Sequence, residues 1–242
     1  MNEEKQLIYN EIISKYKFNI WQKAEIKLGL EKELNISIYA KSEFNDEQMC
    51  QIRLGLEDGL DVSWYSKPEF NEYQMREIRK GLEKSLDVNV YANSEFNADQ
   101  MEEIRLGLEK DLNVGIYANP QFDEFQMWQI RNGLILDLDV SLYADAVFEW
   151  AKMQQIREGL IDGLDVSYYA NIELNWKQMA EIRRGLENKV DVSVYANPEF
   201  DPWQMFQIRE GLKKGLNVES YLNPSISWQE MERIRFELKG NK

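Results

Sequence analysis

Histidine is absent from this chain of 242 residues, and cysteine occurs only once, at Cys50. Without histidine the chain cannot build a Ser-His-Asp or Cys-His catalytic group, nor any metal site with imidazole ligands. A single cysteine excludes an intramolecular disulfide and every zinc or iron–sulfur site that needs several thiolates. Glycines occur singly, so no phosphate-binding loop is predicted. We therefore expect no metal, no cofactor and no enzymatic activity.

Long apolar runs and an excess of basic residues are also missing. No stretch approaches the roughly 18 uncharged apolar residues of a transmembrane helix. The first residues are acidic and polar and lack a secretory apolar region, so we expect a cytoplasmic protein with no membrane contact. Against 43 Asp and Glu stand only 29 Lys and Arg, which gives a net charge of −14. This charge disfavours broad attraction to nucleic-acid phosphates.

What the chain does contain is a repeat with a period of 26 residues. Every full repeat carries an Ile-Arg or Ile-Lys pair, followed at fixed positions by a glycine and a tyrosine. We count eight full repeats and a ninth that is truncated after Leu238. The arginines form a ladder along the chain: Arg53, Arg79, Arg105, Arg131, Arg157, Arg183, Arg209 and Arg235.

The segment 44–69 indicates how one repeat starts. Asn45 is a good helix N-cap, and Gln48 three residues later completes a capping box. Phe44 before the cap and Met49 inside the helix are placed to form a hydrophobic staple. These devices predict the start of a helix of about 14 residues.

The rest of the repeat predicts a buried stripe, a close approach and a second, shorter helical turn. Met49, Ile52, Leu56 and Leu60 fall within a narrow arc of the helix, so we expect them to be buried. A glycine inside a helix costs about 1 kcal/mol relative to alanine, so we expect Gly55 to make room for the helix of the next repeat. A single repeat cannot bury its own stripe, and neighbouring repeats must therefore stack.

The sequence thus predicts an all-α fold, a right-handed-type α-solenoid of about nine 26-residue helix–turn–short-helix repeats. We expect residues 1–17 to form an N-terminal capping helix and residues 18–242 to form the solenoid as a single domain. We also expect Trp21, Trp150, Trp176 and Trp228, at the helix starts, to pack as wedges between repeats.

The consensus QMxxIRxGLExGLDVSxYA resembles tandem repeats that recur in large, poorly characterised bacterial phage and mobile-element proteins. The resemblance covers about residues 18–242, nearly the whole chain. It implies a phage or mobile-element context, and it implies no particular activity.

The arginine ladder has two interpretations. It resembles a phosphate-tracking stripe, as in RNA-binding proteins that bind one nucleotide per repeat. In the other interpretation, each arginine pairs with a carboxylate at the junction between repeats, such as Glu57 one helical turn after Arg53. We favour the pairing because the net charge opposes phosphate binding.

Acidic residues are concentrated in the central repeats. Residues 91–170 contain 15 acidic and five basic residues, a net charge of −10. An elongated protein with a dense carboxylate surface can mimic a phosphate backbone, although charged helix faces are usually just solvated. Asp139 and Asp165 are also placed to cap the short helices. The acidic residues concerned are Asp111, Asp123, Glu124, Asp137, Asp139, Asp145, Glu149, Asp162 and Asp165.

Apolar residues depart from the repeat pattern at helical positions that are otherwise polar. The positions equivalent to 47, 50, 57 and 58 point away from the predicted stripe. Exposed aromatic clusters mark protein–protein contacts, unless the short helices or the curvature of the solenoid cover these positions. The residues are Phe125, Trp128, Ile135 and Leu136 in the fifth repeat, Trp203 and Phe206 in the eighth, and Phe236 near the end.

These features together predict a non-enzymatic binding protein whose partner is a protein with a basic surface. The most concrete hypothesis is a phage or mobile-element inhibitor of a host defence nuclease, for example an anti-CRISPR protein, that mimics nucleic acid. Its acidic repeats would contact the nuclease, with Phe125 and Trp128 as apolar anchors. The alternatives are an RNA- or DNA-binding module that uses the arginine ladder, and a plain structural scaffold.

Overall fold

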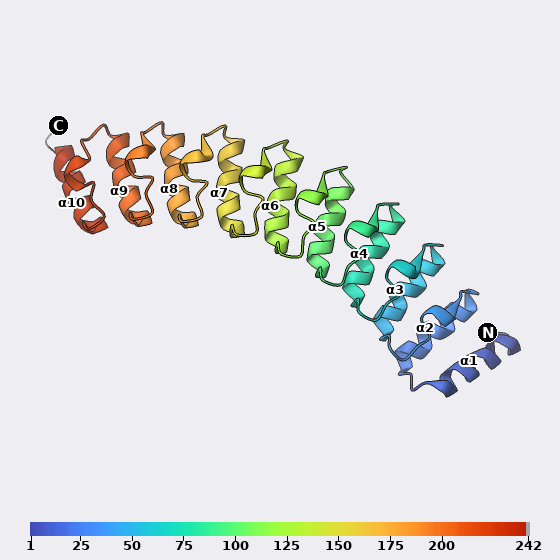
Figure 1. The fold of residues 1–242 in the computed structure, drawn as a ribbon. Helices are drawn as coiled ribbons and strands as arrows, with labels where there is room; N and C mark the ends of the chain where they lie inside the picture. The colour runs from blue at the N-terminus through green and yellow to red at the C-terminus, as the bar shows by residue number, and fades with distance from the viewer. Residues whose placement is uncertain (241–242) are drawn as a thin grey trace. The chain divides into compact units, whose positions relative to one another are not determined.

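The computed structural model describes residues 1–240, and every regular element in that range is helical (Figure 1). The α-helices are α1 (Glu3–Lys15), α2 (Ile20–Glu31), α3 (Asp46–Glu57), α4 (Glu72–Glu83), α5 (Ala98–Leu108), α6 (Glu124–Ile135), α7 (Trp150–Ile161), α8 (Trp176–Glu187), α9 (Pro202–Lys213) and α10 (Trp228–Gly240). Short 3-10 helices follow α2 to α9: η1 (Ile36–Ile38), η2 (Val62–Trp64), η3 (Val88–Val90), η4 (Val114–Ile116), η5 (Val140–Leu142), η6 (Val166–Tyr168), η7 (Val192–Val194) and η8 (Glu219–Tyr221). The predicted alternation of a long and a short helix is confirmed.

The chain divides into two compact units, Met1–Met127 and Trp128–Lys242. In the first unit each helix packs on the next, from α1 on α2 to α4 on α5, and α1 occupies the predicted N-terminal capping segment. In the second unit α7 packs on α8, α8 on α9 and α9 on α10. Each unit is therefore a stretch of α-solenoid, as the repeat predicts.

The predicted capping box starts the helices and also joins the repeats. In α3, Asn45 Oδ1 accepts the backbone N–H of Gln48 at 2.7 Å, and Gln48 Oε1 accepts the backbone N–H of Asn45 at 2.8 Å. The amide of Gln48 also donates through Nε2 to the carbonyl of Phe70 in the next repeat, 2.7 Å away. One side chain thus fixes a helix start and the neighbouring loop. The same bond to the next repeat is made by Gln22, Gln74, Gln100, Gln178 and Gln204.

The glycines inside the helices make room for a tyrosine of their own repeat, so the predicted contact with the next helix is wrong. A Cβ atom on Gly55 would lie 1.8 Å from Tyr65 Oη and 3.0 Å from Val62 Cγ1. The Tyr65 ring is fully buried, and its hydroxyl donates to the carbonyl of Gln51 at 3.2 Å. The short helix therefore folds back onto its own long helix. The same contact is found at Gly29, Gly81, Gly107, Gly133, Gly159, Gly185 and Gly211.

The buried stripe is narrower than predicted. Met49 and Ile52 are fully buried, but Leu56 and Leu60 are only half-buried. The reason is that α3 has 12 residues rather than about 14, and the chain turns through Gly59 at a φ of 69°. Leu60 consequently lies outside the helix, and the short helix supplies the missing core residues.

Candidate functional site

The arginine ladder forms contacts between repeats. Arg53 donates from Nε to Glu25 Oε2, 28 residues earlier, at 2.6 Å, and pairs through Nη1 with Glu57 of its own helix. Where the earlier residue is glutamine, the bond persists, as between Arg79 Nε and Gln51 Oε1 at 3.1 Å. The same 28-residue bond is made by Arg105, Arg157, Arg183, Arg209 and Arg235.

These contacts leave little of the ladder exposed to solvent. The side chains of Arg53, Arg79, Arg105, Arg183, Arg209 and Arg235 are 5–15% exposed. Arg131 is buried as well, and Arg157 is half-buried with its guanidinium over the Trp128 ring, 5.3 Å from the centroid. The pairing at the repeat junction that we favoured is therefore observed, but the acceptor in the preceding repeat is a glutamine as well as a glutamate. A guanidinium held in this way offers few free donors to a phosphate.

One contact of the ladder has a marked electrostatic effect. Glu77 is 1% exposed and accepts hydrogen bonds from Arg105 at 2.9 Å and from Lys80 at 2.8 Å. Burial alone would raise the pKa of this carboxyl, but the two cations outweigh burial and hold the pKa below its ordinary value. The charged form of Glu77 thus stabilises the junction between α4 and α5.

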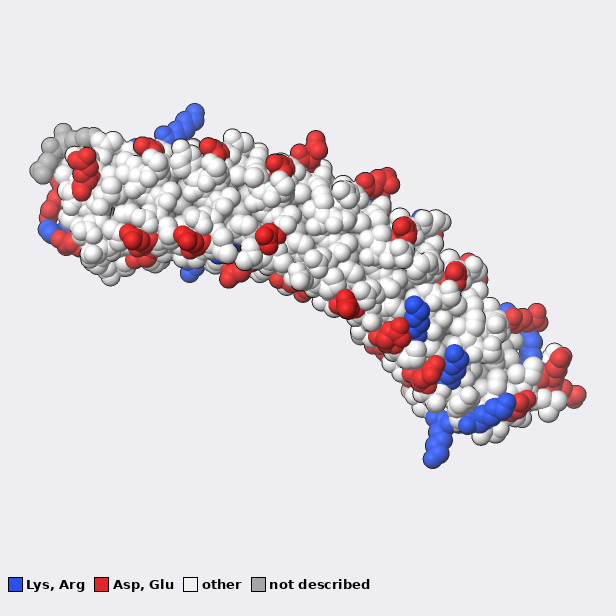
Figure 2. Space-filling view, in the orientation of Figure 1, with Lys and Arg blue, Asp and Glu red and all other residues white. Residues whose placement is uncertain are grey.

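The predicted acidic contact residues are mostly exposed, and several of them cap helices. Asp123 Oδ1 accepts the backbone N–H of Gln126 at 2.7 Å, and Asp139 accepts that of Ser141 at 3.1 Å. Asp137 lies two residues after the end of α6 and has a left-handed backbone, with a φ of 54°. On the face drawn in Figure 2, Asp and Glu side chains are scattered rather than gathered in one patch. Glu124 is half-buried, and Asp111, Asp137, Asp145, Glu149, Asp162 and Asp165 are exposed.

Of the apolar residues predicted at outward helical positions, Phe206 is half-buried and the others are exposed. Phe125 is 57% exposed, Trp128 41%, Ile135 39%, Leu136 51% and Trp203 62%. The alternative that short helices or curvature cover these positions is therefore wrong for all of these residues except Phe206, which is half-buried. Exposed side chains of this size on several helices are a substantial apolar surface for a protein with so many charged residues.

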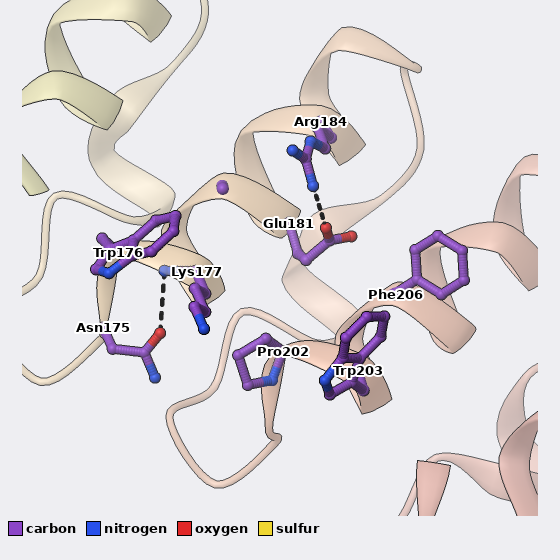
Figure 3. Close-up of a pocket in the computed structure, with 9 residues that line it drawn as sticks. Asn175, Trp176, Lys177, Glu181, Arg184, Pro202, Trp203 and Phe206 are labelled. Carbon is purple, nitrogen blue, oxygen red and sulfur yellow. Dashed lines mark hydrogen bonds and ion pairs between the residues drawn. The ribbon is translucent and has the colours of Figure 1, made fainter. Parts of the chain in front are cut away.

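Two of the predicted contact residues line a groove between α8 and α9, in the second unit (Figure 3). Its volume is about 760 Å³. In Figure 3, Trp176 lies on one side of the groove and Trp203 with Phe206 on the other, with Lys177 between them. The lining residues are Asn175, Trp176, Lys177, Ala180, Glu181, Arg184, Pro202, Trp203 and Phe206.

The groove follows from the local sequence. Asn175 caps α8 and Asp201 caps α9, so Trp176 and Pro202 are the first residues of their helices. The floor of the groove on α8 is Ala180, a methyl side chain at the position where α9 carries Phe206. A small residue on one helix beside a large residue on the next leaves an open space between them.

The carboxylate in the groove is neutralised, whereas two cations reach the solvent. Glu181 is 6% exposed and accepts from Arg184 at 2.5 Å and from Arg209 at 2.9 Å. The Arg184 side chain remains 51% exposed. Lys177 is exposed, with its ammonium over the Trp176 ring at 5.4 Å from the centroid. The accessible charge of the groove is therefore positive.

Three of the four tryptophans at the helix starts are exposed and so are not the wedges that we expected, whereas Trp228 packs against Trp203 of the preceding repeat. Trp21 is 65% exposed, Trp150 44% and Trp176 43%, while Trp228 is half-buried with its ring 5.9 Å from that of Trp203. Trp176, which we expected to pack between repeats, is instead exposed and lines the groove, which we did not predict. The available signal was an indole at a position that varies between repeats, with Asp46, Glu72, Ala98 and Glu124 in four of them and Trp150 and Trp228 in two others.

The remaining observations concern membrane-spanning helices, metal sites and the comparison with known proteins. No helix within residues 1–240 is long and apolar enough to cross a membrane. In the same range, no group of three or more Cys, Asp and Glu side chains is arranged to hold a metal ion. Comparison with protein-family models, with curated proteins and with solved structures finds no match to this chain.

Proposed function

We propose that this chain is a non-enzymatic repeat protein that binds another protein. The observation that carries the proposal is the set of large apolar side chains exposed at the outward positions of α6 and α9 and at the start of α8. Exposed aromatic residues that line a groove are typical of protein contacts, and tryptophan is among the residues that contribute most to binding.

The state of the arginines supports a protein partner over a nucleic acid. A protein that follows a phosphate backbone needs a row of exposed cations, because neutralised phosphates supply most of the affinity. The ladder arginines are largely buried and paired with glutamate or glutamine of the preceding repeat. The net charge of −14 also opposes phosphate binding.

A finer version of the proposal concerns the acidic repeats. In this version the partner is a basic, nucleic-acid-binding protein, such as a host defence nuclease in the cytosol, which a phage or mobile-element protein inhibits as a nucleic-acid mimic. Its support is the exposure of Asp137, Asp145 and Asp162 within a segment of net charge −10. The apolar anchors would then be Phe125 and Trp128.

Affinity capture tests both versions. The purified chain is immobilised and incubated with nuclease-treated bacterial lysate, and the bound proteins are identified by mass spectrometry. We expect a specific protein that is lost when Trp203→Ala or Phe125→Ala replaces the wild type. Binding of labelled single- or double-stranded nucleic acid by the purified chain at low salt, with no protein captured, would contradict the proposal.

A charge-neutralising variant separates the finer version from the general one. Asp123, Asp137 and Asp139 are changed together to asparagine, which also caps helices here, as Asn45 does in α3. The folded state should therefore survive while three negative charges are removed. Weaker capture of a basic protein would support the nucleic-acid mimic. Unchanged capture would leave the general proposal standing and contradict the mimic.

A further inference from the structure

We infer that the groove between α8 and α9 binds a peptide segment of the partner that presents an aromatic or aliphatic side chain flanked by carboxylates. This inference rests on the proposed function, and it names the site and the chemistry of the segment. The inference does not depend on the acidic repeats, so the peptide site and the nucleic-acid mimic can be tested separately.

The shape and lining of the groove suit a large apolar side chain. Trp176 and Trp203 stand on opposite sides, 43% and 62% exposed, and Phe206 continues the apolar wall along α9. The floor is the methyl group of Ala180. The space of about 760 Å³ is large enough for more than one side chain. A large apolar side chain inserted there would bury the indole faces and release their hydration water.

The charged side chains exposed at the groove suit a ligand that carries carboxylates. Lys177 and Arg184 are exposed at the groove. The nearest carboxylate, Glu181, is buried and pairs with Arg184 and with Arg209, which it shares with Glu210. Residues 171–242 contain 11 acidic and 11 basic residues, so the end of the chain is neutral, unlike the acidic segment before it. Carboxylates of a bound peptide would therefore meet two cations without strong repulsion from the surroundings.

The same features favour a peptide over a single strand of nucleic acid. Single strands bind to rows of aromatic residues only when a basic groove follows their backbone. Only two exposed cations, Lys177 and Arg184, are among the residues that line this groove. Asp201, the exposed N-cap of α9, lies next to the lining residue Pro202. Glu210 also neutralises Arg209 at 2.9 Å. A peptide with few charges and one apolar anchor fits this arrangement better than a chain of phosphates.

The repeat itself supplies a variant that blocks the groove. At the position of Ala180, helix α9 carries Phe206 and α6 carries Trp128, so the fold accommodates an aromatic residue there. Ala180→Phe should therefore fold and fill the floor of the groove. Tyr73→Ala is the matched control, because Tyr73 occupies on α4 the helical position that Trp203 occupies on α9 and is 52% exposed.

The experiment is a selection from a random-peptide library displayed on phage, with the full chain as bait. We expect enriched peptides that share an aromatic or aliphatic residue next to Asp or Glu. Synthetic copies, measured by fluorescence anisotropy, should bind Trp203→Ala at least about 30-fold more weakly than the wild type. Lys177→Gln with Arg184→Gln should weaken binding about fivefold and reduce its salt dependence. Ala180→Phe should abolish binding, and Tyr73→Ala should leave it unchanged.

The alternative outcomes are distinguishable. Enriched peptides that are basic, or that bind Ala180→Phe as well as the wild type, overturn the inference, as does a library that yields no enrichment. A single-stranded oligonucleotide that displaces the peptides would indicate a nucleic-acid site instead. A partner captured from lysate equally by wild type and by Ala180→Phe would leave the proposed function intact and refute this groove as its site. Circular dichroism melts of every variant verify that it is folded.

Discussion

The contact between a helical glycine and a buried tyrosine makes a specific prediction for Gly159 and Tyr169. A Cβ atom on Gly159 would lie 1.7 Å from Tyr169 Oη, and 3.1 Å from both Tyr169 Cζ and Val166 Cγ1. The ring is fully buried and cannot swing into solvent. Its hydroxyl also donates to the carbonyl of Gln155 at 3.2 Å, and this bond would be lost if the ring moved.

The magnitude follows from three contributions. Overpacking of a core costs about 1–3 kcal/mol. Loss of the hydroxyl bond adds about 1 kcal/mol. Alanine in place of glycine inside a helix returns about 1 kcal/mol. We therefore expect Gly159→Ala to lower the free energy of unfolding by about 1–3 kcal/mol.

Tyr169→Phe should rescue this loss. The phenyl ring lacks Oη, and the remaining contacts at 3.1 Å need shifts of only a few tenths of an ångström. The double variant should lie within about 1 kcal/mol of the wild type, so a double-mutant cycle should give a favourable coupling of about 1 kcal/mol or more. Urea denaturation followed by circular dichroism measures the four free energies, and amide hydrogen exchange localises the effect to α7.

A second glycine of the same repeat provides the control. Gly163 has a φ of 66°, and nothing would lie within 4 Å of its Cβ. Gly163→Ala should lower the free energy of unfolding by about 1 kcal/mol, because alanine is disfavoured in the left-handed backbone of this position. Tyr169→Phe should not restore this lost stability. A neutral Gly159→Ala, or effects of Gly159→Ala and Tyr169→Phe that simply add, would refute the explanation.

Three further predictions test the junctions and the core. Gln48→Ala should lower the free energy of unfolding by about 1–3 kcal/mol, measured by urea denaturation, because it leaves a buried carbonyl of the next repeat without its donor. Lys80 and Arg105 hold the pKa of Glu77 below its ordinary value. The stability that the charged Glu77 contributes is therefore complete above the ordinary carboxyl pKa and is lost as the pH falls through the lowered pKa. In acid titrations followed by circular dichroism, Glu77→Gln should lose less stability than the wild type. Burial raises the pKa of Tyr143 to about 12 and that of the equivalent tyrosines in the same direction, so stability should be complete below the ordinary tyrosine pKa and fall as the pH rises beyond it. In a variant whose four other tyrosines, Tyr9, Tyr16, Tyr73 and Tyr168, are changed to phenylalanine, tyrosinate absorbance should appear together with the loss of helical circular dichroism. Tyrosinate formation by this variant in the intact fold would contradict the prediction.

The fold was predictable from the sequence because the same signals for helix starts and turns recur in repeat after repeat. Asn45 and Gln48 are recognisable as a capping box from spacing alone, and the capping box depends only on neighbouring residues. The role of Gly55 was not predictable in the same way. Its partner, Tyr65, follows a turn whose direction depends on the left-handed backbone at Gly59. The sequence shows that room is needed but not which side chain needs it.

The candidate site was predicted only in part for a related reason. Trp203 and Phe206 stand out because they replace polar residues at outward positions of a helix, and the exposure of Trp203 is confirmed. Trp176 and Ala180 lie on the preceding helix, and only packing between α8 and α9 places them in the same groove. A groove is a property of two surfaces, whereas helical periodicity describes one helix at a time.

The bond between each ladder arginine and the residue 28 positions earlier has a consequence for inheritance. Arg53 receives a carboxylate from Glu25, and Arg79 receives an amide oxygen from Gln51, yet both bonds form. The eight full repeats all carry glutamate or glutamine at this position, so any of them can precede a repeat with the arginine and offer it an acceptor. Unequal recombination between copies of the gene can thus add or delete whole 26-residue blocks without creating a faulty seam, and homologues should differ in repeat number more readily than in repeat length.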